Sequence, residues 1–194
     1  MKPTRIVLCL HKDEEAFPSD KNYEIDNNDN NTLVYYNIDE DTYMYNKKLY
    51  KSITYLIYYK ENYAIGLFGI MKKNKFLGYH HKDIERIKIL YDPITFKEEY
   101  VYMSSYKHEG KWIEWEKCDK IFDKLLIYVS KYSHANYSKP GIKWRMFGFA
   151  NDYCSNRYNA IILYPSLIKD ESILYIPDQI SNCSFLKRFL KIIK

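Results

Sequence analysis

The chain has few cysteines, and their spacing excludes two kinds of small-protein scaffold. The four cysteines stand at positions 9, 118, 154 and 183 and form no Cys-x-x-Cys pair. A zinc ribbon needs such pairs, and a disulfide framework needs a denser set of cysteines in a shorter chain. We therefore expect reduced thiols, which are usual in a cytoplasmic protein.

A long hydrophobic run is also missing from the N-terminal segment. MKPTRIVLCLHKDEE contains an apolar run of five residues, IVLCL. That run is too short for the core of a signal peptide or for a membrane span. Together with the reduced thiols, it predicts a cytoplasmic location.

The chain also lacks a strong excess of one charge. Its net charge is +5, with acidic residues concentrated between positions 13 and 41 and a basic C-terminal tail. Such a modest excess does not point to nucleic-acid binding. The acidic segment 20–32 is rich in Asn and Asp but has neither the Gly nor the terminal Glu of an EF-hand loop. A mobile, solvated loop is favoured there over a cation site.

Tyrosine and β-branched residues are abundant, with 22 tyrosines against only six glycines. These residue types favour strands. Short apolar runs bounded by Asn, Asp, Gly, Pro or Lys recur along the chain, which is typical of an antiparallel β-sandwich. We predict a mainly β, single domain over residues 1–194. The expected strands are RIVLCL, TLVYYNI, ITYLIYY, AIGLFGIM, IERIKILY, EEYVYMSS, KWIEW, LLIYVS and NAIILY.

Two segments have a helical pattern. EKCDKIFDKLL, residues 116–126, predicts a short helix before a strand. In the C-terminal segment 181–194, Phe185, Phe189 and Ile193 recur every four residues, with lysine and arginine between them. That spacing predicts an amphipathic helix. Docking on the sheet is favoured for this helix over contact with a membrane surface.

The stretch YHHKDIERIKILYD, residues 79–92, crowds ionisable groups at the start of a strand. Side chains alternate between the two faces of a strand, so Asp83, Glu85, Ile87 and Ile89 share one face. The two isoleucines indicate that this face is the inner one. Both carboxylates are therefore expected to enter the interior.

Buried carboxylates need compensation, because an unpaired buried charge costs several kcal/mol. A basic partner, a shared proton or a divalent cation would each supply it, and His80 stands close enough in the sequence to join a His-x-x-Asp-x-Glu cluster. The alternative is that Arg86, Lys82 and Lys88 pair with the acids at the surface and that nothing binds.

Three further stretches extend the pattern. They are HHKDIERIKILYDPITFKEEYVYMSSYKHEGKWIEW, LLIYVSKYSHANYSKPG and GFANDYCSNRYNAIILYP, in that order. This order resembles the vacuolar protein sorting-associated protein 62 family, which has a His-x-x-Asp-Trp-Glu strand, a tyrosine-rich strand, a Trp turn and a Ser-His-Ala-x-Tyr-x-x-Pro-Gly motif. The first element, preceded by ITYLIYYKEN, is also similar to the metal-holding heptapeptide of necrosis- and ethylene-inducing-like cytolysins. The resemblance covers about residues 53–165.

The resemblance implies a β-sandwich with its functional groups at one rim. By the cytolysin likeness, His80, Asp83 and Glu85 would hold a divalent cation, Ca²⁺ or Mg²⁺. By the sorting-protein likeness, His134 and Asp152 would converge on the same rim, as catalytic residues if the protein is an enzyme. In a simpler interpretation, His134 caps its own turn through backbone carbonyls and Asp152 forms an ordinary Asx-turn.

The chain departs from the family pattern at several positions. Ile84 replaces the Trp between the two acids, Lys82 replaces the second His of the heptapeptide, and Tyr106 stands where a His is expected. The upstream acidic ligand of the cytolysins also has no counterpart in the chain. A site short of one carboxylate is expected to hold its cation weakly.

Three functions are therefore expected in turn. The first is a cytosolic binding module that recognises an anionic headgroup or phosphate through a divalent cation, in membrane trafficking or host interaction, with peripheral membrane contact through the basic tail. The second is a metal-dependent hydrolase of a phosphodiester-type bond, with His134 as general acid or base. The third is a structural or interaction protein whose site has decayed.

Overall fold

The computed structural model describes residues 3–12, 18–19, 33–63, 79–104, 110–144 and 152–167. The predicted acidic loop at 20–32, the strand at 64–71 and the C-terminal helix at 181–194 lie outside these residues. Within the described residues, no helix is long and apolar enough to cross a bilayer.

Strands make up most of the described chain, in agreement with the predicted mainly β fold. In chain order the elements are β1 (Ile6–His11), β2 (Pro18–Ser19), β3 (Leu33–Tyr45), β4 (Lys48–Asn62), β5 (His80–Tyr91), β6 (Glu98–Met103), β7 (Lys111–Glu114), the 3₁₀ helix η2 (Trp115–Lys117), β8 (Lys120–Ile121), β9 (Lys124–Val129), β10 (Asn136–Tyr137), β11 (Gly141–Lys143), β12 (Asp152–Cys154) and β13 (Tyr158–Leu167).

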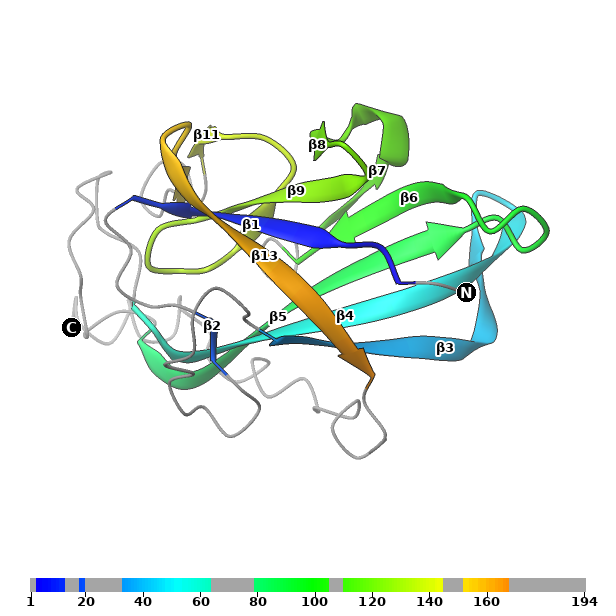
Figure 1. The fold of residues 1–194 in the computed structure, drawn as a ribbon, viewed down its shortest axis with the longest axis horizontal. Coiled ribbons are helices and arrows are strands. Elements are labelled where there is room, and N and C mark those ends of the chain that lie inside the picture. Colours follow the sequence, from blue (N-terminus) through cyan, green and yellow to red (C-terminus); the bar gives the residue numbers. More distant parts are fainter. Residues whose placement is uncertain are drawn as a thin grey trace, which may run out of the picture.

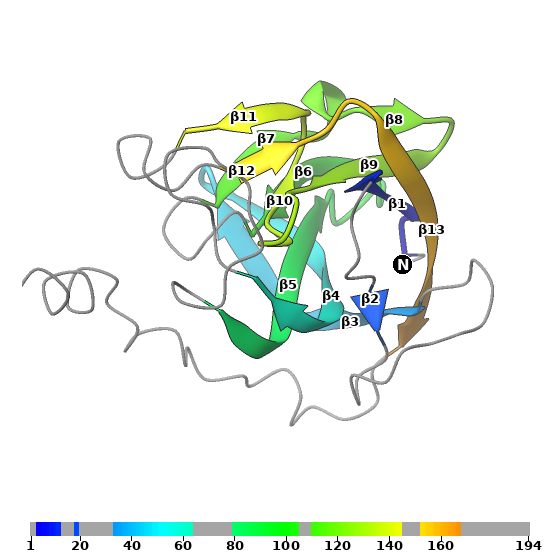
Figure 2. The same ribbon diagram turned by 90° about the vertical axis from the view of Figure 1, so that its left-hand side faces the viewer.

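The main sheet has the strand order β10-β9-β1-β13-β3-β4-β5-β6-β7, with β2 added to β4 and β8 to β9, while β11 and β12 form a separate pair. Its neighbouring strands are antiparallel except for β1–β9 and β13–β3, which are parallel. The sheet curls, because the backbone N–H of Asn136 in β10 donates to the carbonyl of Ser104 just after β6, 3.3 Å away. Figure 2 shows β3, β4 and β5 on one side of the interior and β1, β9 and β13 around the other. This is the sandwich-like arrangement that the strand pattern predicts.

The core lies between these two parts of the sheet and takes side chains from both. Residues at alternate positions of each strand enter it, as a period of two requires. Each fully buried isoleucine or leucine there contributes about 1.5–3 kcal/mol of transfer free energy. The strands contribute Ile6, Leu8 and Leu10 from β1, Ile53, Tyr55, Ile57 and Tyr59 from β4, Ile87, Ile89 and Tyr91 from β5, Val101 and Met103 from β6, and Leu125, Ile127 and Val129 from β9.

A second cluster covers the opposite face of β1 and β9. Val7 and Cys9 from β1 pack there with Leu126 and Tyr128 from β9 and with Cys154 from β12. Because β12 covers this face, β1 is buried on both sides. That explains why its sequence, IVLCL, is continuously apolar instead of alternating.

The helix predicted over residues 116–126 is wrong. This segment contains the last two residues of η2, the short strand β8 and the start of β9. Ile121 pairs with Lys124 across a turn in which Phe122 has a positive φ of 55°. The apolar residues of the segment are used with a period of two, since Leu125 faces the main core and Leu126 faces the second cluster. Pairing of β9 with β1 therefore overrides the local helical pattern.

Candidate functional site

The pairing of β4 with β5 brings the predicted site residues to one end of the sheet. In this register Tyr59 lies opposite Asp83, and Asn62 lies opposite His80. Asp83 shares its face with the core residues Ile87 and Ile89, and it is buried, as the alternation predicts.

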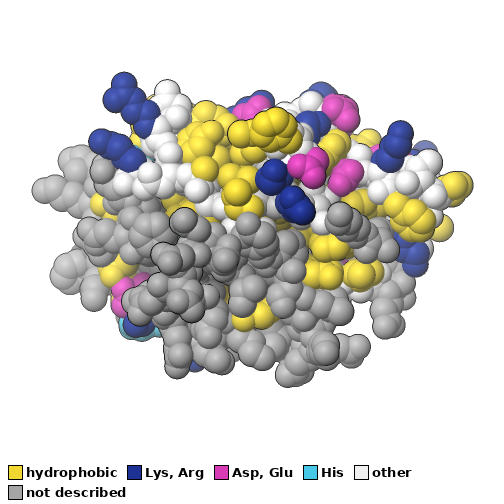
Figure 3. Space-filling view, viewed as in Figure 1, with side chains coloured by type: hydrophobic (Ala, Val, Ile, Leu, Met, Phe, Trp, Pro, Cys, Tyr) yellow, Lys and Arg dark blue, Asp and Glu magenta, His cyan; other side chains and the backbone are white. Residues whose placement is uncertain are grey.

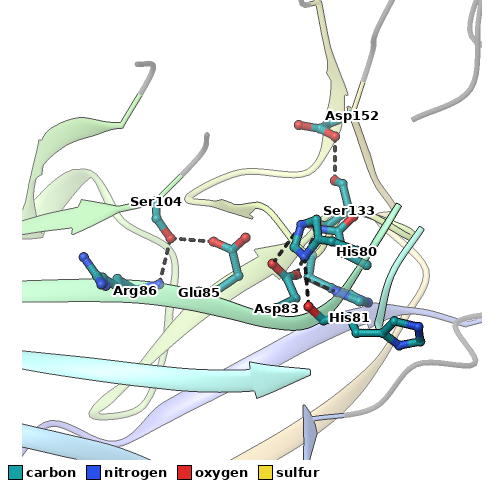
Figure 4. Close-up of polar contacts among 10 residues, drawn as sticks. His80, His81, Asp83, Glu85, Arg86, Ser104, Ser133 and Asp152 are labelled. Atoms are coloured by element: carbon teal, nitrogen blue, oxygen red, sulfur yellow. Dashed lines mark hydrogen bonds and ion pairs between the residues drawn. The ribbon is translucent and has the colours of Figure 1, made fainter. Parts of the chain in front are cut away.

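Asp83 is held by three side chains. Its Oδ2 accepts a hydrogen bond from Asn62 Nδ2 at 3.0 Å and lies 3.1 Å from Nδ1 of His134. Its Oδ1 lies 3.7 Å from Nε2 of His80. The side chain of Asp83 is 8% exposed and that of His80 is 45% exposed, so the second oxygen faces an imidazole that solvent reaches. Figure 4 shows these groups at the start of β5.

His134 is fully buried in the turn between β9 and β10. Its ring lies against the ring of Tyr59, and its backbone has a positive φ of 55°. The turn is closed by two backbone hydrogen bonds, from Ser130 to Ala135 and from His134 to Ser130. Within the described residues, Nε2 of His134 has no hydrogen-bond partner. The imidazole binds Asp83 and not the backbone carbonyls of its own turn, so it does not act as a simple turn cap.

Glu85 lies on the same face of β5 as Asp83 but makes a different contact. Its Oε2 accepts a hydrogen bond from Ser104 Oγ at 2.5 Å, and Ser104 Oγ in turn accepts one from the backbone N–H of Arg86 at 2.8 Å. Figure 4 shows Glu85 turned toward Ser104. Across the described ranges, no group of three or more His, Cys, Asp or Glu side chains is arranged to hold a metal ion. Of the predicted ligand set, the structure brings His80 and Asp83 together and ties Glu85 to Ser104.

Asp152 comes to the same rim through the residue next to His134. Its Oδ1 accepts a hydrogen bond from Ser133 Oγ at 2.6 Å, and its Oδ2 accepts one from Tyr137 OH at 2.5 Å. The carbonyl of Ser133 accepts the second amide hydrogen bond of Asn62, at 2.9 Å. Asp152 therefore positions the turn that carries His134, a role that neither the catalytic prediction nor the Asx-turn interpretation described.

The neighbouring histidine belongs to a separate rim cluster. Nδ1 of His81 lies 3.6 Å from Oε1 of Glu61, and Tyr79 OH donates to the same oxygen at 3.0 Å. Tyr63 OH donates to the other oxygen of Glu61. Desolvation, followed by the hydrogen bond to Glu61, raises the pKa of Tyr79 above its ordinary value. This cluster stiffens the rim beside His80.

The surface ion pairs that could have neutralised the two acids of β5 form elsewhere in part. Nζ of Lys88 binds Oδ2 of Asp39 at 3.0 Å. Lys88 is therefore engaged on the opposite face of β5 from Asp83 and Glu85, because its position in the strand differs by an odd number of residues.

The sequence did not single out two residues that complete the site. Tyr59 stands in a strand where tyrosines are common, and only its two-residue spacing from Ile57 indicates an inward direction. Asn62 carries no local signal, because its role depends on the register between β4 and β5.

We compared the chain with protein-family models, with curated proteins and with solved structures, and none of the three comparisons gave a match. The resemblance to the sorting-associated family therefore stays a prediction that rests on the quoted motifs.

Proposed function

We propose that this chain is a binding module that recognises a phosphate-type anionic group through a divalent cation held between Asp83 and His80. The single observation that carries the proposal is the arrangement of the Asp83 carboxylate. One oxygen is fixed by Asn62 and His134, and the other faces the exposed imidazole of His80 at 3.7 Å.

Charge supports a cation at this point. Asn62 is a neutral donor, and the carboxylate of Asp83 would repel an anion that approached it directly. A divalent cation beside Oδ1 would compensate the buried carboxylate and attract the anion. Mg²⁺ in particular is commonly held by one or two carboxylates, with water and phosphate oxygens completing its shell.

The donor set fits such an ion as an open site. Asp83 Oδ1 and His80 Nε2 supply one oxygen and one nitrogen, which suit Mg²⁺, Ca²⁺ or Mn²⁺. Glu85 is not needed, since its Oε2 is taken by Ser104. With two protein ligands, the cation alone should bind weakly and the anion should strengthen its binding.

The test is calorimetric titration of the full chain with Mg²⁺, Ca²⁺ and Mn²⁺, each with and without glycerol 3-phosphate. The variants are Asp83→Asn and His80→Gln, and Asp123→Asn removes an exposed acid outside the site as a matched control. We expect cation-dependent phosphate binding that weakens about tenfold or more in both site variants and stays unchanged in the control. A second arm with phosphatidic acid vesicles separates a lipid headgroup from a soluble phosphate. Equal binding by wild type and Asp83→Asn would contradict the proposal.

A second candidate function rests on the Asp83–His134 pair. A hydrogen on Nδ1, bonded to Asp83, leaves the lone pair of His134 on Nε2, which has no partner in the described part of the chain. A group oriented in this way can act as a general acid or base in hydrolysis of a phosphodiester.

Turnover of bis(p-nitrophenyl) phosphate in the presence of Mg²⁺ or Mn²⁺ tests this candidate. His134→Asn is the informative variant, because asparagine tolerates the positive φ at this position while removing the ring. Turnover that disappears in His134→Asn would establish the hydrolase. No turnover by the wild-type chain would leave binding as the function of the site.

A further inference from the structure

The end of the sandwich opposite the rim site carries exposed apolar side chains on two turns. Met44 and Leu49 pair across the β3–β4 hairpin next to its turn, and both are exposed. Ile94 and Phe96 lie in the β5–β6 turn and are 84% and 54% exposed. We call these four residues the tip surface. Soluble proteins seldom place several large apolar side chains together in solvent without a partner.

Fixed contacts hold the two turns together. Nζ of Lys48 binds Oδ2 of Asp92 at 2.9 Å and Oε1 of Glu99 at 2.6 Å, which joins the β3–β4 hairpin to the β5–β6 hairpin. Oδ1 of Asp92 accepts hydrogen bonds from the backbone N–H groups of Ile94 and Thr95, at 2.9 and 2.8 Å. The apolar side chains of the tip surface are therefore presented by an ordered backbone.

Two lysines flank the tip surface. Lys47 and Lys97 are exposed, and among the described residues neither makes an ion pair. The acids nearest to them in the turns, Asp92 and Glu99, are already paired with Lys48. Figure 3 shows hydrophobic side chains and Lys or Arg side chains together at the end of the molecule where these hairpins lie. The free charge of this end is therefore positive.

We propose that the tip surface docks the chain onto an anionic lipid bilayer. Ile94 and Phe96 would enter the boundary between headgroups and acyl chains, and Lys47 and Lys97 would lie among the negatively charged headgroups. A bilayer accepts protruding side chains one at a time. A specific protein partner would need a continuous surface of about 800 Å² on each side, which two hairpin turns do not offer.

The orientation follows from the strands. β4 runs from Lys48 at the tip surface to Asn62 at the rim site, and β5 runs from His80 at the rim site to Tyr91 beside the tip surface. A chain docked by its tip surface points His80 and Asp83 away from that bilayer. The docking does not depend on the function proposed for the rim site, and it favours a soluble carrier for the phosphate group.

Co-sedimentation with phosphatidylcholine vesicles, with and without phosphatidylserine, tests the proposal. The apolar variant is Ile94→Ser with Phe96→Asn, where asparagine tolerates the positive φ at position 96. The charge variant is Lys47→Glu with Lys97→Glu. Ile142→Ser removes an isoleucine that is 53% exposed on β11 and serves as the matched control. Thermal unfolding of each variant confirms that it is folded.

We expect the wild type to bind vesicles that contain phosphatidylserine and to bind pure phosphatidylcholine less well. The apolar and charge variants should each bind about tenfold more weakly, while Ile142→Ser and Asp83→Asn bind like the wild type. Three results would overturn the proposal: no vesicle binding by the wild type, unchanged binding by the apolar variant, or loss of binding in Asp83→Asn. Self-association of the wild type that the apolar variant abolishes, without vesicle binding, would assign the surface to a second copy of the chain instead.

Discussion

The imidazole ring of His134 is stacked on the phenol ring of Tyr59, with ring centroids 3.9 Å apart and planes 6° from parallel. The same imidazole binds Asp83, which lies opposite Tyr59 in the β4–β5 pair. Tyr59 therefore fixes the plane of the ring, and Asp83 fixes its rotation within that plane. This preorganisation leaves little freedom for the ring before a ligand arrives.

Replacing Tyr59 by leucine should loosen the site and destabilise the fold. The change removes a fully buried ring and its stacking contact, which should lower the free energy of unfolding by about 1–3 kcal/mol. Urea denaturation of Tyr59→Leu measures the loss, and Tyr45→Leu on the other side of the sheet, where the ring is half-buried, should cost less. An equal cost in the two variants would contradict the importance of the stack.

The β5–β6 turn should weaken in acid. The backbone N–H of Thr95, followed by Lys48 and the N–H of Ile94, holds the pKa of Asp92 well below its ordinary value. A lowered pKa in the folded state gives stability that is complete above the unfolded pKa of about 4 and is lost as the pH falls toward the folded value. Wild type should exceed Asp92→Asn in stability by a constant amount near neutrality, and the difference should shrink in acid.

Urea denaturation of both proteins at a series of pH values gives that difference. Asp123→Asn, which removes an acid that is 75% exposed, provides the comparison and should show no such pH dependence. A difference between wild type and Asp92→Asn that persists unchanged into strong acid would contradict the assignment.

The buried thiols should resist alkylation in the folded chain. Burial raises the pKa of Cys118 to about 11 and that of Cys9 to about 12. Burial also raises the pKa of Cys154. Because the thiolate is the reactive form, iodoacetamide should modify these three positions slowly near neutral pH and quickly in urea. Peptide mapping by mass spectrometry after timed quenching measures the rates, and fast labelling of Cys9 in the folded chain would contradict them.

The alternation within β5 could be predicted from the sequence because it is local. A period of two places Asp83 with Ile87 and Ile89 on the inner face, and the structure confirms it. The partner of Glu85 could not be predicted in this way. Ser104 reaches Glu85 only because β6 pairs with β5, and nothing in either segment specifies that contact.

The contact between Asp83 and His134 joins residues 51 positions apart. Spacing cannot predict such a pair, and only the family resemblance suggested a common rim. The wrong helix over residues 116–126 has a related cause. Its apolar residues match a helical pattern locally, but β9 gains partners on both sides, β1 and β10, which no local pattern reveals.

The most direct test of the cation site is a crystal of the full chain soaked in Mn²⁺ and measured for anomalous scattering. The account predicts a peak within bonding distance of Asp83 Oδ1 and His80 Nε2, at about 2.0–2.3 Å from each, and its loss in crystals of Asp83→Asn. A Mn²⁺ peak bound elsewhere, or a rim without any peak in well-soaked crystals, would contradict it.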